Sequence, residues 1–466
     1  MTQPQGPAET GSHDTRRSRL TLGIAGLAAM VTYLDTTILF VAFPDITSSF
    51  GESPPSSLSW VLNAYTIIFA ALLVPAGKLA DRLGHRRAFL VGSFTFTVAS
   101  MACGLAPSVE SLVAARILQG TGAAILVPAS LALVIAAFSR EKLPRVVAIW
   151  GAIGAFSAAL GPSLGALVVD GFGWRWAFFL NLPFGIITLV AGVRYLRESR
   201  DPAVPIPSVL GVVLIALAAG SLAYGVVESD AVGWGSAQTV VMLGVGLLLL
   251  GAFVAHQRWT KSPTLDLELF ALANFRWGNL AMFSFSLAFS AMFFGLILFL
   301  VNVWGWSIIE AGLAVTPGPL LAAFLAPRFG KLAGQIGQRP LIIAGGLAFA
   351  ASALYRMAIL TTEVNYVMGI AIPLAVDAVA IALVFPQVTS VAVQALPANR
   401  TGVGGAVTQA VRQFGGSFGV ALTIALIGST TATMHLGAGF EHLWWLLVAA
   451  GLATAAFALP LRPRTS

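Results

Sequence analysis

Asp35 is the side chain in this sequence whose setting most plainly calls for chemistry, because it lies in an apolar stretch that reads VTYLDTTILFVAFPD. A carboxylate can bind and release a proton, but an ionised carboxylate inside a bilayer costs about 2.5–3.5 kcal/mol on insertion scales. A chain retains such a residue where a partner charge or a water-filled path offsets this cost. We therefore expect a partner or an aqueous path at Asp35.

Arg116, in the stretch LVAARILQGTGAA, is the predicted partner of Asp35. If its helix enters the membrane near Ser111, Arg116 lies roughly 8 Å below that surface at a rise of about 1.5 Å per residue. If the other helix leaves the membrane near Val41, Asp35 lies roughly 9 Å below the same surface. We predict that Asp35 faces an aqueous cavity, with Arg116 nearby or coupled through Gln119. Burial disfavours an ionised carboxyl group and a guanidinium favours it, so the site could exchange a proton near physiological pH. The alternative is a static ion pair that holds two helices together.

A second acid and another arginine lie deep in later apolar stretches. Asp377 lies about 12 residues into the stretch 365–393, roughly 18 Å from the outer surface. Arg412 lies about 11 residues into the stretch 402–428, roughly 16 Å from the inner surface. We expect both near the middle of the bilayer, where Asp377 is either a second proton or cation site or the neutralising partner of Arg412.

Phe285, Phe289 and Phe293 recur at every fourth position and predict an aromatic stripe on one helix face. Facing inward, the stripe would form a wall for flat lipophilic cargo and would attract cations; facing outward, it would contact lipid. Four further side chains are candidate polar contacts of a cavity: Asn63, Tyr65, Gln387 and Gln409.

Enzymatic signatures are missing from the sequence. The five histidines have no metal-binding spacing, and the glycine-rich stretches lie in apolar spans rather than after a soluble strand. No Walker-type sequence is present, so ATP is not the direct energy source. We expect no enzyme activity, no metal and no cofactor.

The elements that position these residues must be membrane helices. Of 466 residues, 57% are hydrophobic and 10% are charged, and the mean hydropathy is +0.87, whereas soluble proteins carry about 25% charged residues. The net charge of +7 falls in short clusters between apolar runs, which indicates membrane topology rather than nucleic-acid binding. A single cysteine, Cys103, excludes a disulfide framework.

Fourteen apolar runs are long enough to span a bilayer as helices. They are 20–41, 58–77, 87–106, 111–138, 144–169, 176–197, 206–227, 238–257, 278–303, 307–329, 340–360, 365–393, 402–428 and 441–461. Basic residues precede the first run and follow the even-numbered runs, and acidic residues follow the odd-numbered ones, with Arg175 and Arg356 as exceptions. This alternation predicts an all-α membrane protein with both termini in the cytoplasm.

An internal repeat predicts the architecture. GKLADRLGHRR at 77–87 reappears as GKLAGQIGQRP at 330–340, each after the second helix of a six-helix block. Such repeats are typical of transporters whose halves rock around a midplane site. We therefore predict two pseudo-symmetric six-helix bundles with two inserted central helices. The predicted division is a cytoplasmic tail at 1–19, a bundle at 20–200, an insertion with linkers at 201–260, a bundle at 261–461 and a tail at 462–466.

Two motifs carry small or charged residues at informative spacing. In the first copy of the repeat, two glycines permit a tight reversal and four charged residues form a cytoplasmic cluster: Gly77, Gly84, Asp81, Arg82, Arg86 and Arg87. In GAIGAFSAALGPSLGALV at 151–168, small residues recur on one helix face and a proline adds a kink: Gly154, Ala158, Gly161, Gly165 and Pro162. The charged cluster could be only a topology anchor, and the small face could serve only close helix packing.

Several stretches in order resemble the major facilitator superfamily, and within it the fourteen-helix drug:proton antiporters. They are LDTTILFVAFP, GKLADRLGHRR, LVAARILQGTGAA, GAIGAFSAALGPSLGALV, WRWAFFLNLPFG and RQFGGSFGVA. The resemblance implies a latch between bundles at 77–87, with Asp81 at the N-terminus of the helix that begins near Gly402. It implies an antiporter helix, with Gly151 beside the residues above, that shapes the interface between bundles. It also implies that the helices of Asp35 and Arg116 line the central cavity.

These observations favour a monomeric, proton-coupled antiporter in a bacterial plasma membrane that exports lipophilic or cationic drugs by alternating access. Its partners would be the cargo, protons and the lipid bilayer. Two alternatives stay open: an exporter or flippase of lipid-like metabolites with the same fold, and a non-transporting sensor or scaffold. The sequence assigns no role to the two inserted helices.

Overall fold

The computed structural model describes residues 10–51, 53–139, 142–200, 206–396, 400–431 and 436–462. These residues are helices and short connections, with no strand among them. The first half contains α1 (Thr10–Ser49), α2 (Pro55–Leu83), α3 (His85–Gly104), α4 (Val109–Ala137), α5 (Leu143–Phe172), α6 (Arg175–Phe179) and α7 (Asn181–Tyr195).

The inserted pair is α8 (Val209–Val232) and α9 (Ala237–Trp259), followed by a short 3₁₀ segment, η1 (Leu267–Ala271). The second half contains α10 (Ala273–Asn302), α11 (Ile308–Val315), α12 (Pro317–Ile336), α13 (Gln338–Ile359), η2 (Val367–Ala371), α14 (Ile372–Gln394), α15 (Thr401–Thr431) and α16 (Leu436–Ala458). Within the described residues, thirteen spans are long and apolar enough to cross a membrane. The 30-residue α5 occupies the position of the remaining expected span.

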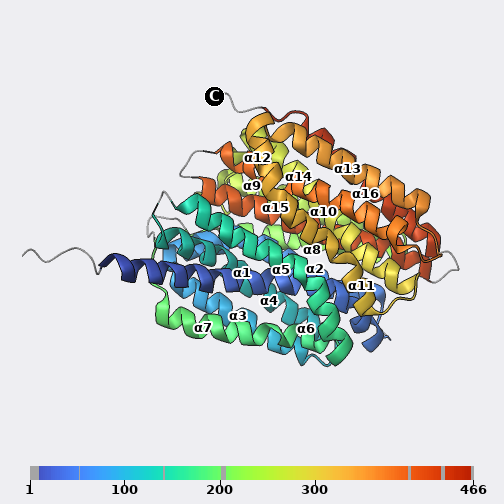
Figure 1. The fold of residues 1–466 in the computed structure, drawn as a ribbon, viewed down its shortest axis with the longest axis horizontal. Helices are drawn as coiled ribbons and strands as arrows, with labels where there is room; N and C mark the ends of the chain where they lie inside the picture. The colour runs from blue at the N-terminus through green and yellow to red at the C-terminus, as the bar shows by residue number, and fades with distance from the viewer. Residues whose placement is uncertain are drawn as a thin grey trace, which may run out of the picture.

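The two halves lie face to face (Figure 1), with α1–α7 in the lower part of the view and α12–α16 in the upper part. Between the halves, α2 packs along α15, α5 packs against α11 and α12, and α1 meets α10. The inserted helices α8 and α9 pack on each other, and α8 also packs on α2 and α15. The insertion therefore covers one flank of the junction between the halves.

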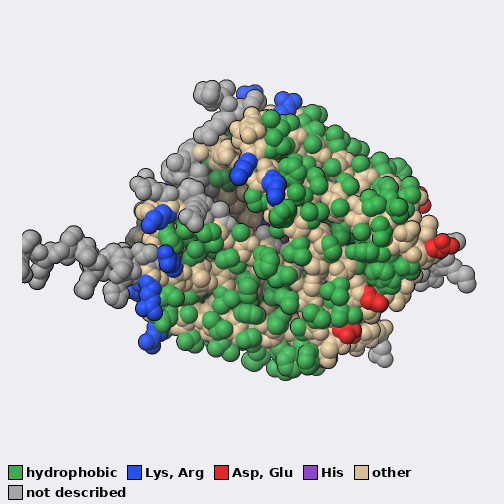
Figure 2. Space-filling model, viewed as in Figure 1, with side chains coloured by type: hydrophobic (Ala, Val, Ile, Leu, Met, Phe, Trp, Pro, Cys, Tyr) green, Lys and Arg blue, Asp and Glu red, His purple; other side chains and the backbone are tan. Residues whose placement is uncertain are grey.

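Charge divides the molecule into two ends (Figure 2). Lys and Arg gather at one end, and Asp and Glu gather at the other. We call them the basic end and the acidic end. Hydrophobic side chains cover the surface between them, and a recess opens between the halves near the basic end (Figure 2). The charge pattern is the one that the positive-inside rule associates with a cytoplasmic basic end.

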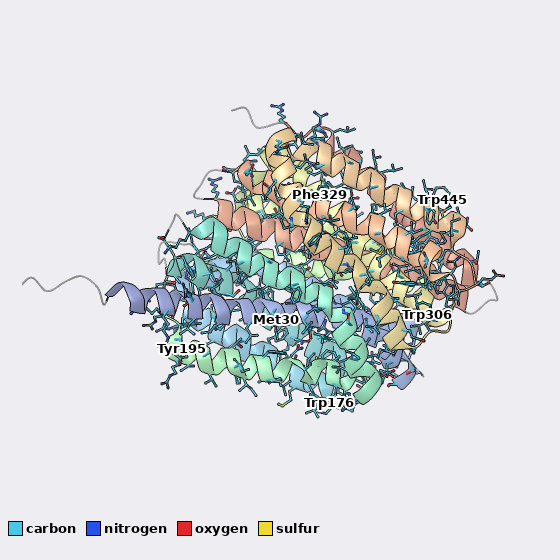
Figure 3. All side chains as sticks on the ribbon, in the orientation of Figure 1. Met30, Trp176, Tyr195, Trp306, Phe329 and Trp445 are labelled. Carbon is cyan, nitrogen blue, oxygen red and sulfur yellow. The ribbon has the colours of Figure 1, made fainter. Side chains whose placement is uncertain are left out.

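Aromatic side chains mark both edges of the apolar belt (Figure 3). Trp176 and Trp445 lie toward the acidic end and are 49% and 50% exposed, and Tyr195 lies toward the basic end and is 37% exposed. Exposed Trp and Tyr at these levels are typical of the two membrane–water interfaces.

α1 begins at Thr10, so residues 10–19 of the predicted cytoplasmic tail are helical and continuous with the first membrane helix. The rest of the predicted tail, residues 1–9, lies outside the described residues, as do residues 463–466.

Candidate functional site

Asp35 lies on α1 at the centre of a hydrogen-bond network. Its Oδ2 accepts a hydrogen bond from Arg116 Nη1 at 2.7 Å. Its Oδ1 accepts one from Gln119 Nε2 at 2.8 Å and one from Asn181 Nδ2 at 2.7 Å. The structure thus brings together Asp35, Arg116 and Gln119, the three residues predicted to act as one site.

Helix α4 aims two polar side chains at Asp35 because Arg116 and Gln119 are three residues apart and share a face. Ser108 begins this helix with a capping box, which fixes where α4 starts. Arg116 Nε also donates to the Val61 carbonyl oxygen at 3.0 Å, and its guanidinium lies 4.0 Å from the centre of the Tyr65 ring. The arginine is therefore held from α1, α2 and its own helix.

Ser100 and Asn181 extend the network to α3 and α7. The Ser100 hydroxyl oxygen accepts from Gln119 Nε2 at 2.7 Å and from Asn181 Nδ2 at 2.9 Å. Sequence reasoning missed both residues, although an asparagine in the apolar run FFLNLPFG is a detectable signal. Donors from α4 and α7 meet at the carboxylate of α1, and both of its oxygens have partners.

Asp35 does not face water in this conformation. Its side chain is 1% exposed, as is that of Arg116. The prediction of a cavity-facing Asp35 is therefore wrong for this state, because Gln119 and Asn181 occupy the space that water would need. Access for a proton requires a rearrangement around the carboxyl group.

Asp377 pairs with Arg356, not with Arg412 as one prediction had it. Arg356 Nη2 donates to Asp377 Oδ2, Arg356 Nη1 donates to Ser352 at 3.2 Å, and both charged side chains are fully buried. Arg356 lies inside α13, within the run predicted at 340–360, although the charge pattern counted it with the connection that follows. Because α13 and α14 form a tight hairpin, the last turn of one meets the start of the other, and the two charges come to the same depth.

Arg412 on α15 stays without a carboxylate partner among the described residues. Its guanidinium lies 4.6 Å from the centre of the Phe385 ring. The side chain is half-buried, as are those of Tyr33, Gln409 and Phe385. These side chains lie together where α1, α14 and α15 meet, and we call the partly open region beside them the central space.

Tyr33 joins the two halves across this space. Its hydroxyl accepts a hydrogen bond from Gln409 Nε2 at 3.4 Å. Gly154 on α5 gives the ring room, because a Cβ there would lie 2.7 Å from the Tyr33 ring. One glycine of the predicted antiporter helix therefore positions a contact between the halves.

The small face of α5 packs mainly on α1 within its own half. A Cβ at Gly161 would collide with the Thr37 hydroxyl, and one at Gly165 would lie 3.2 Å from Ile38. Gly151 does not share this role, because nothing lies within 4 Å of its Cβ position. The side chain of Ala158 lies outside the described residues.

Other residues of α5 make the contact with the second half. A Cβ at Gly312 of α11 would lie 2.8 Å from the Pro162 carbonyl oxygen and 2.6 Å from Ala166. Ser163 and Thr316 share a hydrogen bond of 2.6 Å between their hydroxyl groups. The interface predicted for the glycines is therefore made by Pro162, Ser163 and Ala166, near the acidic end.

The phenylalanine stripe on α10 faces the protein interior. Phe285 packs edge-on against Phe349 and Phe385, and Phe289 packs edge-on against Phe385 at 5.5 Å. Phe293 is 2% exposed and lies 6.1 Å from Phe40 of α1. The lipid-facing alternative is therefore wrong, and a role as cargo wall stays a prediction for the half-buried Phe289.

Aromatic contacts close the junction toward the acidic end. Phe294 of α10 lies 5.7 Å from Phe40 and 5.2 Å from Phe43, between ring centres. Together with the contacts of α5 and α11, this packing seals the acidic side, while the recess of Figure 2 lies near the basic end. The structure thus has the form of a transporter closed on one side.

The predicted latch at 77–87 makes contacts within the first half and one beyond it, since Lys78 Nζ donates to the Pro263 carbonyl oxygen at 2.8 Å. Asp81 Oδ1 lies 2.8 Å from His85 Nε2 in its own hairpin, and the backbone N–H groups of Arg86 and Arg87 donate to Glu198 at 2.9 and 3.2 Å. Gly84 has φ = 121°, and a Cβ there would lie 2.5 Å from the Glu198 carboxylate, so glycine is required. The contact predicted between Asp81 and the helix that begins near Gly402 is not among those described for Asp81. Gly77 lies inside α2 rather than at the reversal, and a Cβ there would lie at an ordinary 3.5 Å from Pro128; Arg82 belongs to the last turn of α2.

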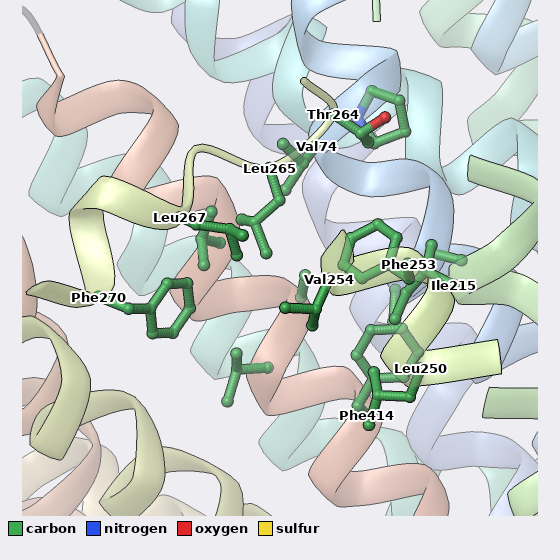
Figure 4. Close-up of a pocket in the computed structure, with 16 residues that line it drawn as sticks. Val74, Ile215, Leu250, Phe253, Val254, Thr264, Leu265, Leu267, Phe270 and Phe414 are labelled. Carbon is green, nitrogen blue, oxygen red and sulfur yellow. The ribbon is translucent and has the colours of Figure 1, made fainter. Parts of the chain in front are cut away.

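A separate apolar pocket of about 320 Å³ lies on the flank covered by the insertion (Figure 4). Its walls come from α2, α8, α9, η1 and α15. They include Val74, Ile215, Val254, Phe270 and Phe414. The lining is almost wholly apolar, as expected of a space that accepts hydrocarbon.

Comparisons with known proteins agree with this geometry. The model of the Major Facilitator Superfamily matches residues 25–420. The chain is 36% identical over 428 residues to the multidrug resistance protein Stp of Mycobacterium tuberculosis (strain CDC 1551 / Oshkosh), covering 90% of this chain and 78% of the relative. It is 32% identical over 468 residues to the cephamycin export protein CmcT of Amycolatopsis lactamdurans, covering 97% and 96%.

The fold also has solved counterparts. The crystal structure of an auto-inhibited POT family peptide transporter superposes with a TM-score of 0.67 at 18% identity, covering 97% of this chain and 98% of that one. At this identity the likeness shows the fold alone.

Proposed function

Because this chain belongs to the major facilitator superfamily, we propose that it exports lipophilic small molecules of the drug and antibiotic class in exchange for protons. Members of this family are transporters, not enzymes, and the chain is a multi-pass membrane protein. The relatives named above are multidrug resistance and antibiotic export proteins.

The Asp35 network is the observation that supports proton coupling. An ionised Asp35 is stabilised here by Arg116 and by two amide donors. Binding of a proton would remove the negative charge and with it the attraction between α1 and α4. A carboxyl group whose charge state decides how two helices of one half pack can couple a proton to a conformational change.

Cargo and protons would cross the membrane by alternating access, in which the protein opens to one side at a time. The present state is closed toward the acidic end by Phe40, Phe43 and Phe294, and its central side chains Tyr33 and Arg412 are half-buried. We propose that cargo enters from the basic end, and that opening of the acidic end then lets the cargo leave and a proton reach Asp35. The halves would rock about the central site between them.

Within the described membrane spans, no unpaired acid is available to bind the cationic part of the predicted cargo range. Both carboxylate oxygens of Asp35 already accept hydrogen bonds, and Asp377 is paired with Arg356. We therefore keep the lipophilic class, for which the wall at Phe289 and Phe385 is suited.

Purified protein in proteoliposomes with an imposed pH gradient tests the proposal. Lipophilic drugs should move in the direction opposite to protons, as followed by drug fluorescence and by a pH dye. Asp35→Asn should abolish the coupled flux, whereas Glu363→Gln, in an exposed connection, should leave it unchanged. Coupled flux at the normal rate in Asp35→Asn would refute the assignment.

The pocket of Figure 4 favours one second candidate, export of lipid-like molecules. Its apolar walls lie on the flank of the bundle rather than in the central space. The same proteoliposomes can carry a fluorescent lipid whose inner and outer leaflet pools are distinguished by a quencher. Movement of the lipid without movement of drugs would support this candidate, and inertness toward both would support a scaffold.

We further propose that the protein works as a monomer without a cofactor in the bacterial plasma membrane, with the basic end and both termini in the cytoplasm. The charge division of Figure 2 supports this orientation.

A further inference from the structure

Charges deep in the described spans do not balance. Asp35 is held by Arg116, and Asp377 is held by Arg356. Arg412 is the remaining cation, and the described residues give it an aromatic ring but no carboxylate. An arginine in this position lies about 11 residues, or roughly 17 Å, into α15. Such a charge is costly inside a membrane unless something pairs with it.

The position of Arg412 suits a ligand rather than a structural partner. Both halves contribute to its surroundings: Tyr33 comes from α1, and Gln409 and Phe385 come from α15 and α14. These side chains keep part of their surface exposed, although each lies on the middle of a helix. The cation therefore borders the central space from which cargo would be carried.

Chemistry decides which ligand fits. A guanidinium has donors but no acceptor, and its planar fork matches a carboxylate through two parallel hydrogen bonds. One face of the Arg412 guanidinium is covered by Phe385, which leaves its edge for such a pair. Phe289 continues the aromatic wall beyond Phe385 at 5.5 Å, and Tyr33 and Gln409 add a hydroxyl and an amide.

We propose that Arg412 binds the carboxylate of an acidic, lipophilic cargo, whose apolar body lies against Phe385 and Phe289. This inference rests on the proposed export function and narrows its substrate class. Cationic cargo is disfavoured at this site, because it would meet an unpaired arginine. The acid of the cargo supplies the negative charge that the described residues do not place beside Arg412.

Binding of matched probes to the purified protein tests the inference without a gradient. Dansylglycine and dansylglycinamide share a flat aromatic body and differ in the carboxylate, and naphthoxyacetic acid and its amide form a second pair. We expect the unmodified protein to bind the acid of each pair about ten- to a hundredfold more tightly than the amide. Arg412→Gln should lose this preference while the affinity for the amides stays the same.

Two further variants separate charge from folding. Arg412→Lys keeps the positive charge and should keep a reduced preference for the acids, since lysine lacks the fork. Tyr33→Phe should weaken acid binding less than Arg412→Gln does, because it removes a neutral hydroxyl. Acid preference that survives in Arg412→Gln, or equal binding of acid and amide by the unmodified protein in both pairs, would overturn the inference.

Failure of this inference and failure of proton-driven export give different results. Asp35→Asn should keep the acid preference in binding, because Asp35 is sealed from the central space, and should lose only gradient-driven movement. Loss of gradient-driven transport in the unmodified protein would refute export while leaving the acid preference measurable.

Discussion

Asp35 and Asp377 are both carboxylates buried in the membrane interior, and each accepts a hydrogen bond from an arginine of another helix. Their remaining contacts differ. Both oxygens of Asp35 have partners, from α4 and α7, whereas Asp377 Oδ1 has no hydrogen-bond partner in the described structure. Arg356 likewise leaves its Nε unpartnered.

This difference shows that two acid–arginine pairs at similar burial can serve different ends. The Asp35 pair belongs to a network over five helices of the first half, α1–α4 and α7, so its charge state affects how those helices pack. The Asp377 pair joins two neighbouring helices of one hairpin, α13 and α14. We therefore expect the first pair to control transport and the second to control stability.

The largest expected effect comes from Asp35→Asn, which should reduce proton-coupled transport to the level of empty liposomes. The amide keeps the size of the side chain but cannot take up a proton at this site. Membrane insertion should persist, and thermal stability should fall less than in Asp377→Leu: Arg116 loses its counter-charge in Asp35→Asn, but the Asn oxygen can still accept its hydrogen bond. A variant that loses folding together with transport would contradict the division between the two acids.

Asp377→Leu should instead destabilise the protein by roughly 3–5 kcal/mol, because it leaves Arg356 buried without a counter-charge. Adding Arg356→Met should restore most of the stability, since an apolar pair can replace a buried ion pair. Thermal unfolding in detergent measures both effects, with transport by the double variant as the second readout. Lost coupling in a double variant of normal stability would assign Asp377 to transport.

Substitution of two glycines tests the same assignment, of the Asp35 region to transport and of the Asp377 region to stability. Gly161→Ala forces α5 away from Thr37, two residues from Asp35, and Gly345→Ala places a methyl group 2.5 Å from Val384 at the junction of α13 and α14. Each should cost about 1–3 kcal/mol by overpacking. Only Gly161→Ala should also lower the transport rate of the folded fraction. Gly151→Ala, where nothing lies nearby, is the matched control and should be silent.

The smallest expected effect comes from Asn181→Ala. This substitution removes one of the two donors to Asp35 Oδ1 and one of the two donors to the Ser100 hydroxyl. The transport rate should fall about tenfold, which corresponds to the free energy of one charge-assisted hydrogen bond. Initial rates at several imposed gradients measure the change. An unchanged rate would show that Gln119 alone is sufficient to hold this oxygen.

Most of the fold could be predicted from the sequence because lipid imposes simple rules. Each of the fourteen expected spans corresponds to a helix or to two consecutive ones, as with α6 and α7 or α11 and α12. Pro317 begins α12, and it separates that helix from α11 because proline lacks the backbone N–H. Hydropathy detects the whole span but not this break.

The candidate site was predicted in part, because spacing along a helix gives depth but not direction. Arg116 and Asp35 were placed at one depth, although α1 continues to Ser49, beyond the exit predicted near Val41. Arg356 was assigned to a connection, so its pairing with Asp377 was missed. Asn181 was missed because one amide in an apolar run carries no partner information. The direction of a side chain around a helix axis depends on tertiary packing, which decided the neighbours of Arg412.

The insertion has a mechanical consequence. Helix α8 carries Val226 and Val227 against Ala421 and Ala425 of α15, and Ala219 and Ala223 against Ile67 of α2. Helix α8 of the insertion thus packs on both halves at once. Separating the halves at this flank would break these apolar contacts. We therefore expect this flank to act as a hinge between the halves. The halves would then separate more at the opposite interface, where α5 meets α12.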